Sequence, residues 1–271
     1  MSPSAAPDLP IAGVPTGHSK WTTERVLEVR YWTPAMLSFR TTRDDAFRFT
    51  PGHYARLGLA ADDGSIAWRP FSMVSAATDH HLEFLAVLVP GGAFSSALAR
   101  LRVGDSIQVE RASFGFLTVD QLAAGRDLWL LASGTGLGPF VSILRDPSVW
   151  RAFERLIVVH SVRRSSELAY RTELAALADE HLLVAGAARL LYLPVVTREQ
   201  GATALASRIP RLIADGRLEE AAGRRLSVLA SRLMICGNPE LALALRQILG
   251  ARGFATSRRG IPGQMAFEKY W

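Results

Sequence analysis

The chain has 271 residues, of which 49% are hydrophobic and 21% are charged, and its formal net charge at pH 7 is +6. This length allows one large domain or two ordinary ones, and no apolar run reaches the roughly 18 residues that a membrane span needs. The single cysteine, Cys236, excludes an intramolecular disulfide, a cysteine-ligated cluster and a structural zinc within the chain. We therefore expect a reducing, cytoplasmic setting, no metal and no membrane partner.

The basic excess lies in the second half of the sequence. Residues 1–125 hold 11 basic and 12 acidic side chains, whereas residues 126–271 hold 20 and 13. A nucleic-acid surface usually shows clustered basic runs with interleaved aromatics, and here the arginines are scattered, so no nucleic-acid partner is expected. An acidic small ligand, an acidic protein partner or a solvated surface fits this charge distribution better.

Short strands are predicted in the first half. Residues 1–20 are rich in Pro, Ala, Ser and Gly and predict a disordered tail. Alternation over residues 24–43, broken at Thr33-Pro34, predicts a pair of antiparallel strands, and further strands are expected at residues 82–90 and 106–110. Strands this short and closely spaced predict a small antiparallel β-barrel within residues 21–125.

One short motif combines several kinds of side chain. It is Arg69-Pro70-Phe71-Ser72, which supplies a cation, a proline that stiffens the backbone, an aromatic ring and a hydroxyl. A flavin nucleotide needs these groups, because its diphosphate takes a cation and its isoalloxazine takes a ring and a hydroxyl. A surface cation beside a core ring fits the same pattern. Gly91-Gly92 precedes a helix predicted at residues 95–101, where free N–H groups favour an anion, although a plain capped helix fits as well.

Strands and helices alternate in the second half. An apolar run at residues 127–132 leads into Gly134-Thr135-Gly136-Leu137-Gly138-Pro139 and then a helical segment from Val141. Strand, glycine-rich turn and helix form the arrangement that receives a dinucleotide pyrophosphate, although the third glycine comes earlier than in G-x-G-x-x-G. With further strands at residues 156–160, 192–196 and 232–236, we expect a doubly wound parallel α/β domain over residues 126–271.

Arginines follow these strands where an NAD-selective site would carry an acid. Arg163, Arg198 and Arg208 favour a 2′-phosphate, and hence NADP, although each one alone also fits a solvated loop charge. A helix is predicted to start at Ser166, and Tyr170 within it fits either an adenine contact or core packing.

Two features near the end of the chain are candidates for the cofactor crevice. Cys236 ends a predicted strand there and is kept as a catalytic candidate, although a small buried side chain without a His-Asp partner favours packing over a nucleophilic role. Chain ends are usually polar, so the terminal Trp271 is expected to dock against a flat group, with ordinary core packing as the alternative.

In order and spacing these motifs resemble the bacterial ferredoxin (flavodoxin)–NADP reductases over residues 21–271. The terminal segment resembles the subgroup that ends in tryptophan. The resemblance rests on Arg69-Pro70-Phe71-Ser72, Gly91-Gly92-Ala93-Phe94-Ser95, Gly134-Thr135-Gly136-Leu137-Gly138-Pro139, Val158-Val159-His160-Ser161-Val162-Arg163, Glu167-Leu168-Ala169-Tyr170, Val196-Thr197-Arg198, Ser207-Arg208-Ile209-Pro210 and Cys236-Gly237-Asn238-Pro239.

The resemblance implies an FAD-binding barrel and an NADP-binding second domain. It places Ser72 near flavin N5 and Trp271 against a face of the flavin, and these two residues, together with Cys236, are the catalytic candidates. The family usually has Tyr where this chain has Phe71, so a phenolic hydrogen bond is lost while stacking is kept, and Glu268 is given no role. The implied FAD residues are Arg69, Pro70, Phe71, Ser72, Val87, Gly92, Ser95, Thr135 and Trp271, and the implied NADP residues are Gly134, Gly136, Arg163, Arg198, Arg208 and Tyr170.

The expected activity is hydride transfer from NADPH to flavin N5, followed by single-electron transfer to a ferredoxin or flavodoxin. The carrier is expected to be acidic and the enzyme a monomer. Two alternatives remain. One is another free-standing NAD(P)H–flavin reductase, such as an oxygenase or ferric reductase component, and the other is a non-catalytic nucleotide-sensing protein on the same fold.

Overall fold

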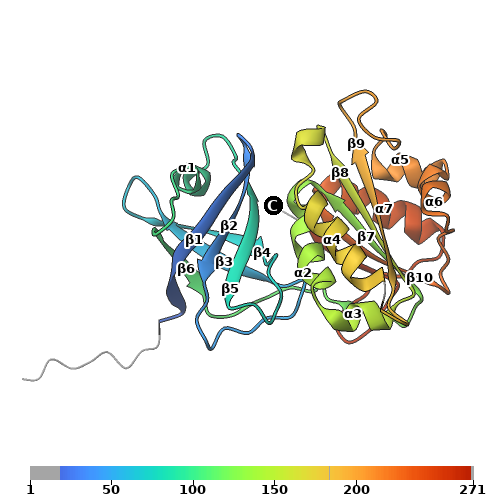
Figure 1. Cartoon of the computed structure of the whole chain (residues 1–271), viewed down its shortest axis with the longest axis horizontal. Helices are drawn as coiled ribbons and strands as arrows, with labels where there is room; N and C mark the ends of the chain where they lie inside the picture. Colours follow the sequence, from blue (N-terminus) through green and yellow to red (C-terminus); the bar gives the residue numbers. More distant parts are fainter. Residues whose placement is uncertain (1–18, 183, 270–271) are drawn as a thin grey trace, which may run out of the picture.

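The computed structural model describes residues 19–182 and 184–269, and these form an antiparallel unit followed by an α/β unit (Figure 1). The predicted tail at residues 1–20 lies outside the described residues except for Ser19 and Lys20, and so does Trp271. Within these described ranges, no helix is both long enough and apolar enough to cross a membrane.

Six antiparallel strands make up the first sheet, and the pair at its β1–β2 position is the one that the alternation over residues 24–43 predicts. Their order across the sheet is β4-β3-β6-β1-β2-β5, so β4 and β5 are its two edges. The break at Thr33-Pro34 is the β1–β2 turn, with Val29 opposite Phe39 in the register. The strands are β1 (Trp21–Thr33), β2 (Met36–Thr42), β3 (Tyr54–Ala60), β4 (Ile66–Ser72), β5 (His81–Val87) and β6 (Ser106–Glu110).

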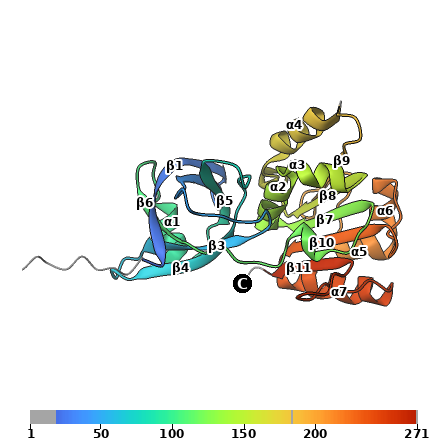
Figure 2. The same ribbon diagram turned by 90° about the horizontal axis from the view of Figure 1, so that it is seen from below.

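This sheet curls so that its edges approach each other, which confirms the predicted barrel while leaving a seam between β4 and β5 (Figure 2). One bridge, Met73 to Phe84, joins the two edges beyond the end of β4. Helix α1 (Ala93–Ala99) buries Phe94 and Leu98 in the barrel core. Arg69 and Pro70 are exposed on β4, where Pro is tolerated because an edge strand leaves one side unpaired.

Five parallel strands form the second sheet, in the order β11-β10-β7-β8-β9. Helices α2 to α4 cover one face and α5 to α7 the other (Figure 2). The strands are β7 (Asp127–Ser133), β8 (Arg155–Val162), β9 (Arg189–Val196), β10 (Ser231–Gly237) and β11 (Met265–Lys269), and the helices are α2 (Gly138–Leu144), α3 (Pro147–Ala152), α4 (Arg171–Leu182), α5 (Ile209–Ala214), α6 (Arg217–Ala222) and α7 (Pro239–Ala251).

The strand order reverses at β7. From β7 the chain moves outward through β8 to β9, and it then returns to place β10 and β11 on the other side of β7. In a doubly wound sheet the loops after the strands diverge at such a point and leave a crevice for a ligand. The glycine-rich turn after β7 and the turn after β10 therefore meet there.

Two local predictions need correction. A helix was expected to start at Ser166, but Ser165–Glu167 is a single 3₁₀ turn and α4 begins at Arg171. Tyr170 stands between them with a left-handed φ of 58°, a conformation that interrupts a helix. No strand is predicted near the chain end from the sequence, yet β11 pairs in parallel with β10. A short edge strand of this kind leaves little periodic signal in the sequence.

One buried carboxylate, Glu83 of β5, holds the two units against each other. Its side chain is 4% exposed; Oε2 accepts from Arg145 at 2.9 Å and Oε1 from the Tyr170 hydroxyl at 2.9 Å. Burial alone would raise the pKa of Glu83, but Arg145, Arg40 and the Tyr170 hydrogen bond outweigh it and the net pKa is lowered. Glu83 is therefore an ionised anchor whose donors Arg145 and Tyr170 come from the second unit.

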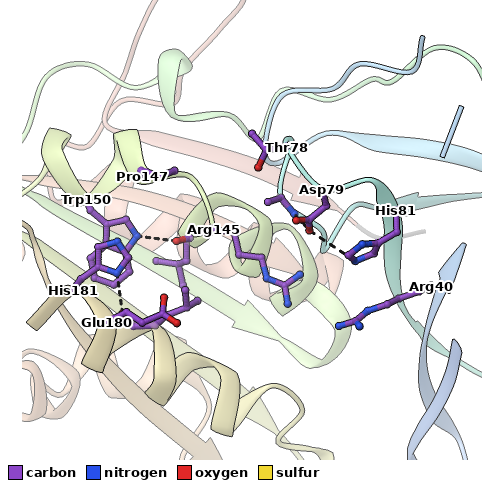
Figure 3. A pocket seen from close by; sticks show the side chains of 12 residues that line it. Arg40, Thr78, Asp79, His81, Arg145, Pro147, Trp150, Glu180 and His181 are labelled. Atoms are coloured by element: carbon purple, nitrogen blue, oxygen red, sulfur yellow. Dashed lines mark hydrogen bonds and ion pairs between the residues drawn. The ribbon is translucent and has the colours of Figure 1, made fainter. Parts of the chain in front are cut away.

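A cavity of about 470 Å³ lies beside this anchor, between the two units. Figure 3 shows Arg40 and Arg145 pointing into it from opposite units, with His81 next to Asp79 on the barrel side. On the other side the rings of Trp150 and His181 stack with centroids 3.7 Å apart. Carboxylate and guanidinium side chains line this cavity in equal number, so the cavity favours neither an anionic nor a cationic ligand.

We expect Tyr170→Phe to lower the free energy of unfolding by about 1.5–3 kcal/mol, the range for a hydrogen bond to a charged group. The ring would still pack against Trp32, whose centroid is 5.0 Å away, so the loss isolates the hydroxyl. Denaturant unfolding measures it, with Tyr31→Phe on the exposed barrel surface as the control. Equal, small changes in both variants would contradict the role of Glu83 as an anchor.

Candidate functional site

The end of β4 meets the last strand of the second sheet. Ser72, the final residue of β4, donates its hydroxyl to Oε1 of Glu268 on β11 at 3.0 Å. Ser72 is buried, and a Cβ on Gly115 of the connecting segment would lie 3.5 Å from Oε2 of Glu268. The contact joins residues 196 positions apart and places a carboxyl at the mouth of the crevice.

Glu268 has an unusual protonation equilibrium. Burial raises the pKa of its carboxyl from 4.5 to about 7, and the hydrogen bond from Ser72 opposes this rise. A carboxyl with such a pKa is present in both protonation states near neutral pH and can gain or lose a proton there. Glu268 has no expected role from the sequence, because a single acid near the end of the chain carries no spacing signal.

Cys236 lies beside Glu268, because the two are paired in the register of β10 and β11. The cysteine is fully buried. A Cβ added to Gly136 would collide with the Cys236 carbonyl, so only glycine lets the turn after β7 approach β10 so closely. The prediction that Cys236 stands at the crevice is therefore consistent with its position, and its burial fits packing better than a nucleophilic role.

The glycine-rich turn begins directly after β7 as a 3₁₀ turn, Gly134–Leu137, and α2 follows with Pro139 in its first turn. Ser133 Oγ accepts from the backbone N–H of Asn238 at 2.9 Å, which fastens this turn to the one after β10. Thr135 is buried within the turn.

Arg163 and Arg198 come together after β8 and β9. The backbone N–H of Arg198 donates to the Arg163 carbonyl at 2.9 Å, so their loops run side by side. The Arg163 guanidinium forms an ion pair with Glu167 at 3.1 Å but remains 60% exposed. Arg208 precedes α5, its side chain is 78% exposed, and its guanidinium lies 3.8 Å from Glu240. Among the described residues, no hydrogen bond joins Arg208 to Arg163 or Arg198.

Tyr170 has a different place from the one expected of a nucleotide ligand. It is 1% exposed, it packs against Trp32 of the barrel, and its hydroxyl is donated to Glu83. Of the two interpretations that the sequence left open, core packing is the one that this burial fits.

On the barrel, the predicted FAD residues line up along β4 and the start of α1. The Phe71 ring packs on Phe94 at 5.2 Å, which connects the strand to the helix. The Arg69 guanidinium is exposed and donates only to the Trp68 carbonyl, at 2.8 Å, among the described residues.

The remaining predicted positions lie at the same end of the barrel. Gly92 caps α1, and Ser95 Oγ accepts from the backbone N–H of Val89 at 3.0 Å, which leaves its own proton available. Val87 ends β5, opposite Met36.

An arginine patch flanks the junction. We use this term for Arg246, Arg258 and Arg259, which line a cavity of about 270 Å³ together with Phe116 and Phe267. The Arg246 guanidinium lies 4.7 Å from the centre of the Phe267 ring. In the part of the chain that the structure describes, none of the three arginines takes part in an ion pair, so the patch is strongly positive.

Two family models match the chain. The oxidoreductase FAD-binding domain matches residues 29–116, and the oxidoreductase NAD-binding domain matches residues 130–247. These ranges fall on the antiparallel unit and on the α/β unit, respectively.

Similar proteins match over nearly the whole chain. Ferredoxin–NADP reductase A of Sorangium cellulosum is 40% identical, covering 92% of this chain and 90% of the relative. The flavodoxin/ferredoxin–NADP reductase of Escherichia coli K12 is 35% identical, covering 93% and 99%. A crystal structure of a ferredoxin NADP⁺ reductase from Neisseria gonorrhoeae with bound FAD and NADP has a TM-score of 0.86 and 34% identity, covering 94% of this chain and 100% of that one.

We expect Glu268→Gln to remove a pH-dependent loss of stability. Because the folded pKa is about 7 and the ordinary value is 4.5, the contribution of Glu268 is complete below pH 4.5 and is lost as the pH rises to about 7. One pKa unit corresponds to about 1.4 kcal/mol, so wild type should lose up to about 3 kcal/mol relative to the variant.

Denaturant unfolding between pH 4.5 and pH 8 measures this difference. Glutamine keeps an oxygen for the Ser72 hydroxyl, so the hydrogen bond itself is not removed. Glu220→Gln on the exposed surface of α6 is the control. Parallel stability curves for all three proteins would show that Glu268 titrates as an ordinary carboxyl.

Proposed function

The chain belongs to the ferredoxin/flavodoxin–NADP reductase family, and we propose that its active site is the junction around Ser72 and Glu268. The protein is an FAD-dependent oxidoreductase that exchanges electrons between NADP(H) and a ferredoxin or flavodoxin. The observation that carries the site assignment is the hydrogen bond between these two side chains, because it brings the FAD-type unit to the edge of the NAD-type sheet.

The barrel residues fit FAD by their chemistry. An exposed guanidinium at Arg69 and the start of α1 at Gly92 and Ser95 suit a diphosphate, while Phe71 and Ser72 suit a flat ring with polar edges. When bound, FAD would accept a hydride and release electrons one at a time. The FAD set proposed from the sequence also includes Pro70, Val87 and Thr135, and Trp271, which lies outside the described residues.

Ser72 and Glu268 would handle a proton beside the flavin. Glu268 holds a proton at Oε1 or Oε2 near neutral pH, and the Ser72 hydroxyl that donates to Oε1 can pass one on. Ser72 is buried and Glu268 is half-buried, which limits the access of bulk water to the pair. The role of Cys236 is then structural: it is paired with Glu268 in the sheet, and this pairing sets the position of β11.

For NADP(H), we propose the turn Gly134–Leu137 as the pyrophosphate site and the Arg163–Arg198 pair as the 2′-phosphate site. Guanidiniums on adjacent loops can bind one phosphate with several charge-assisted hydrogen bonds. Arg208 remains a candidate from the sequence, whereas Tyr170 is left out because of its burial.

A domain boundary near residues 125 and 126 falls between β6 and β7. A cytoplasmic location and a monomeric state remain the expectations from the sequence.

We expect NADPH to bleach the flavin far faster than NADH when each is mixed anaerobically with the purified holoprotein. Arg198→Ala should reduce the bleaching efficiency with NADPH at least tenfold and leave that with NADH within threefold, because only NADPH carries the phosphate. Arg225→Ala, an exposed arginine beyond α6, is the control. Stopped-flow absorbance measures all three proteins.

The outcomes of this experiment separate the candidate functions. Equal losses for both nucleotides in Arg198→Ala would remove the 2′-phosphate assignment while keeping the enzyme. A colourless protein would favour the nucleotide-sensing alternative. The oxygenase-component alternative has support from fold alone, since the ferredoxin reductase of carbazole 1,9a-dioxygenase is 20% identical with a TM-score of 0.70.

We further propose that the carrier is acidic and docks over the arginine patch next to the junction. Three guanidiniums without acidic partners in the described ranges offer charge complementarity, and Phe116, 50% exposed, offers an apolar contact.

The double variant Arg258→Glu, Arg259→Glu should lower carrier-dependent turnover at least tenfold at low salt, and this loss should shrink as salt increases. Turnover with ferricyanide, a small acceptor, should change less than twofold. Arg211→Glu, Arg225→Glu, at exposed positions before and after α6 in the sequence, is the matched double reversal, because α6 lies at the end of the molecule away from the barrel in both views (Figures 1 and 2). Equal losses in the two double variants would contradict docking at the patch.

A further inference from the structure

His160 is a buried imidazole in the middle of the second sheet. It lies on β8, opposite Ala132 of β7 on one side and Pro194 of β9 on the other, and it is 1% exposed. Packing alone does not require a histidine there, because the residues two positions before and after it on the same face of β8, Val158 and Val162, are valines. A polar ring in this position needs hydrogen-bond partners to offset its burial.

Both ring nitrogens of His160 have a partner. Nε2 lies 3.0 Å from the carbonyl oxygen of Gly134, and Nδ1 lies 3.3 Å from the hydroxyl of Tyr192 on β9. A carbonyl can only accept, so Nε2 must carry the proton. Burial lowers the pKa of His160 to about 4, so the ring is neutral and Nδ1 accepts from Tyr192.

The bond to Gly134 acts on the turn that follows β7. Gly134 has a left-handed φ of 55°, and a Cβ there would meet no heavy atom within 4 Å. Side-chain crowding therefore does not fix the orientation of this peptide, whereas a hydrogen bond from the buried ring does. Two residues later, Gly136 packs against the Cys236 backbone, so the turn is held from β8 and from β10.

The same histidine is three residues before Arg163. β8 continues from His160 to Val162, and the next residue provides the carbonyl that binds the backbone N–H of Arg198. One side chain thus connects the glycine-rich turn with the strand that leads into the arginine pair. A shift of β8 relative to β7 would change the spacing between these two features.

We propose that His160 is a positioning residue of the NADP(H) site, which holds the Gly134 peptide at a fixed distance from the Arg163–Arg198 pair and so sets the span of nucleotide that fits. This inference rests on the proposed function, since it takes the turn and the arginines to be the nucleotide site. Tyr192 assists by donating its hydroxyl to Nδ1, which holds the ring in this orientation.

The test compares two substitutions of similar size in the holoprotein. His160→Gln places an amide N–H near the position of Nε2 and can still donate to Gly134, whereas His160→Met fills the space without a donor. Calorimetric titration of the oxidised holoprotein with NADP⁺ should show at least tenfold weaker binding for the methionine variant and less than threefold for the glutamine variant. In steady state, KM for NADPH should carry the loss while kcat stays within threefold.

A second measurement does not depend on the activity or on the stability of these variants. In the ¹⁵N-histidine spectrum of wild type, His160 should be the neutral Nε2–H tautomer from pH 5.5 to pH 8, and its signals should move when NADP⁺ is added. Tyr192→Phe should remove the hydrogen bond at Nδ1, shift the Nδ1 signal while Nε2 keeps its proton, and weaken NADP⁺ binding at least threefold.

Several outcomes would overturn the proposal. These are equal NADP⁺ affinities in the glutamine and methionine variants, an Nδ1–H tautomer in wild type, or unchanged affinity in Tyr192→Phe. Wild type that binds NADP⁺ no better than NAD⁺ would instead count against the proposed function, which separates the two failures.

Discussion

The architecture depends on burying one negative charge between two independently built sheets. Glu83 comes from the barrel, yet Arg145 and Tyr170 reach it from the second unit. Because an unpaired carboxylate in this environment would be strongly unfavourable, the two units have one preferred orientation rather than a range. That orientation brings the end of β4 to β11, so the distance from Ser72 to Glu268 follows from a contact at a separate position in the interface.

Local patterns in the sequence were sufficient for most of the fold. Alternation with a break at Thr33-Pro34 locates β1 and β2, and an all-apolar run locates β7, because strand periodicity and two-sided burial leave direct traces in residue order. The motif at Arg69–Ser72 is informative because several residue types with one chemical purpose stand side by side. Arg163 and Arg198 were grouped because each follows a predicted strand of the second domain, and their loops do run side by side.

The features that the sequence missed depend on tertiary contacts. β11 owes its existence to pairing with β10, and the shifted pKa of Glu268 owes its value to burial, so neither has a local pattern. Tyr170 shows the opposite case, because its motif predicts a ligand contact while its left-handed backbone turns the ring into the barrel interface. His160 was visible only as part of a motif, since its two hydrogen bonds join three strands that are distant in sequence.

The crevice is therefore built from turns that constrain one another. Gly136 must be small for β10 to approach, Ser133 binds the peptide after Gly237, and His160 fixes the peptide at Gly134. The backbone N–H groups of such turns are preorganised, so ordering them on ligand binding costs little free energy. This rigidity contrasts with the exposed arginines at the loop ends, whose long side chains retain conformational freedom.

Pro70 has a consequence beyond any contact with a cofactor. It lies on β4, whose outer side is left unpaired by the seam of the barrel, and an unpaired edge is a template on which a second chain could add a strand. Proline presents no N–H to such a strand, and the neighbouring Arg69 places a charge beside it. Pro70 and Arg69, which we propose as FAD residues, thus also oppose the pairing of β4 with a strand of a second molecule before the cofactor binds.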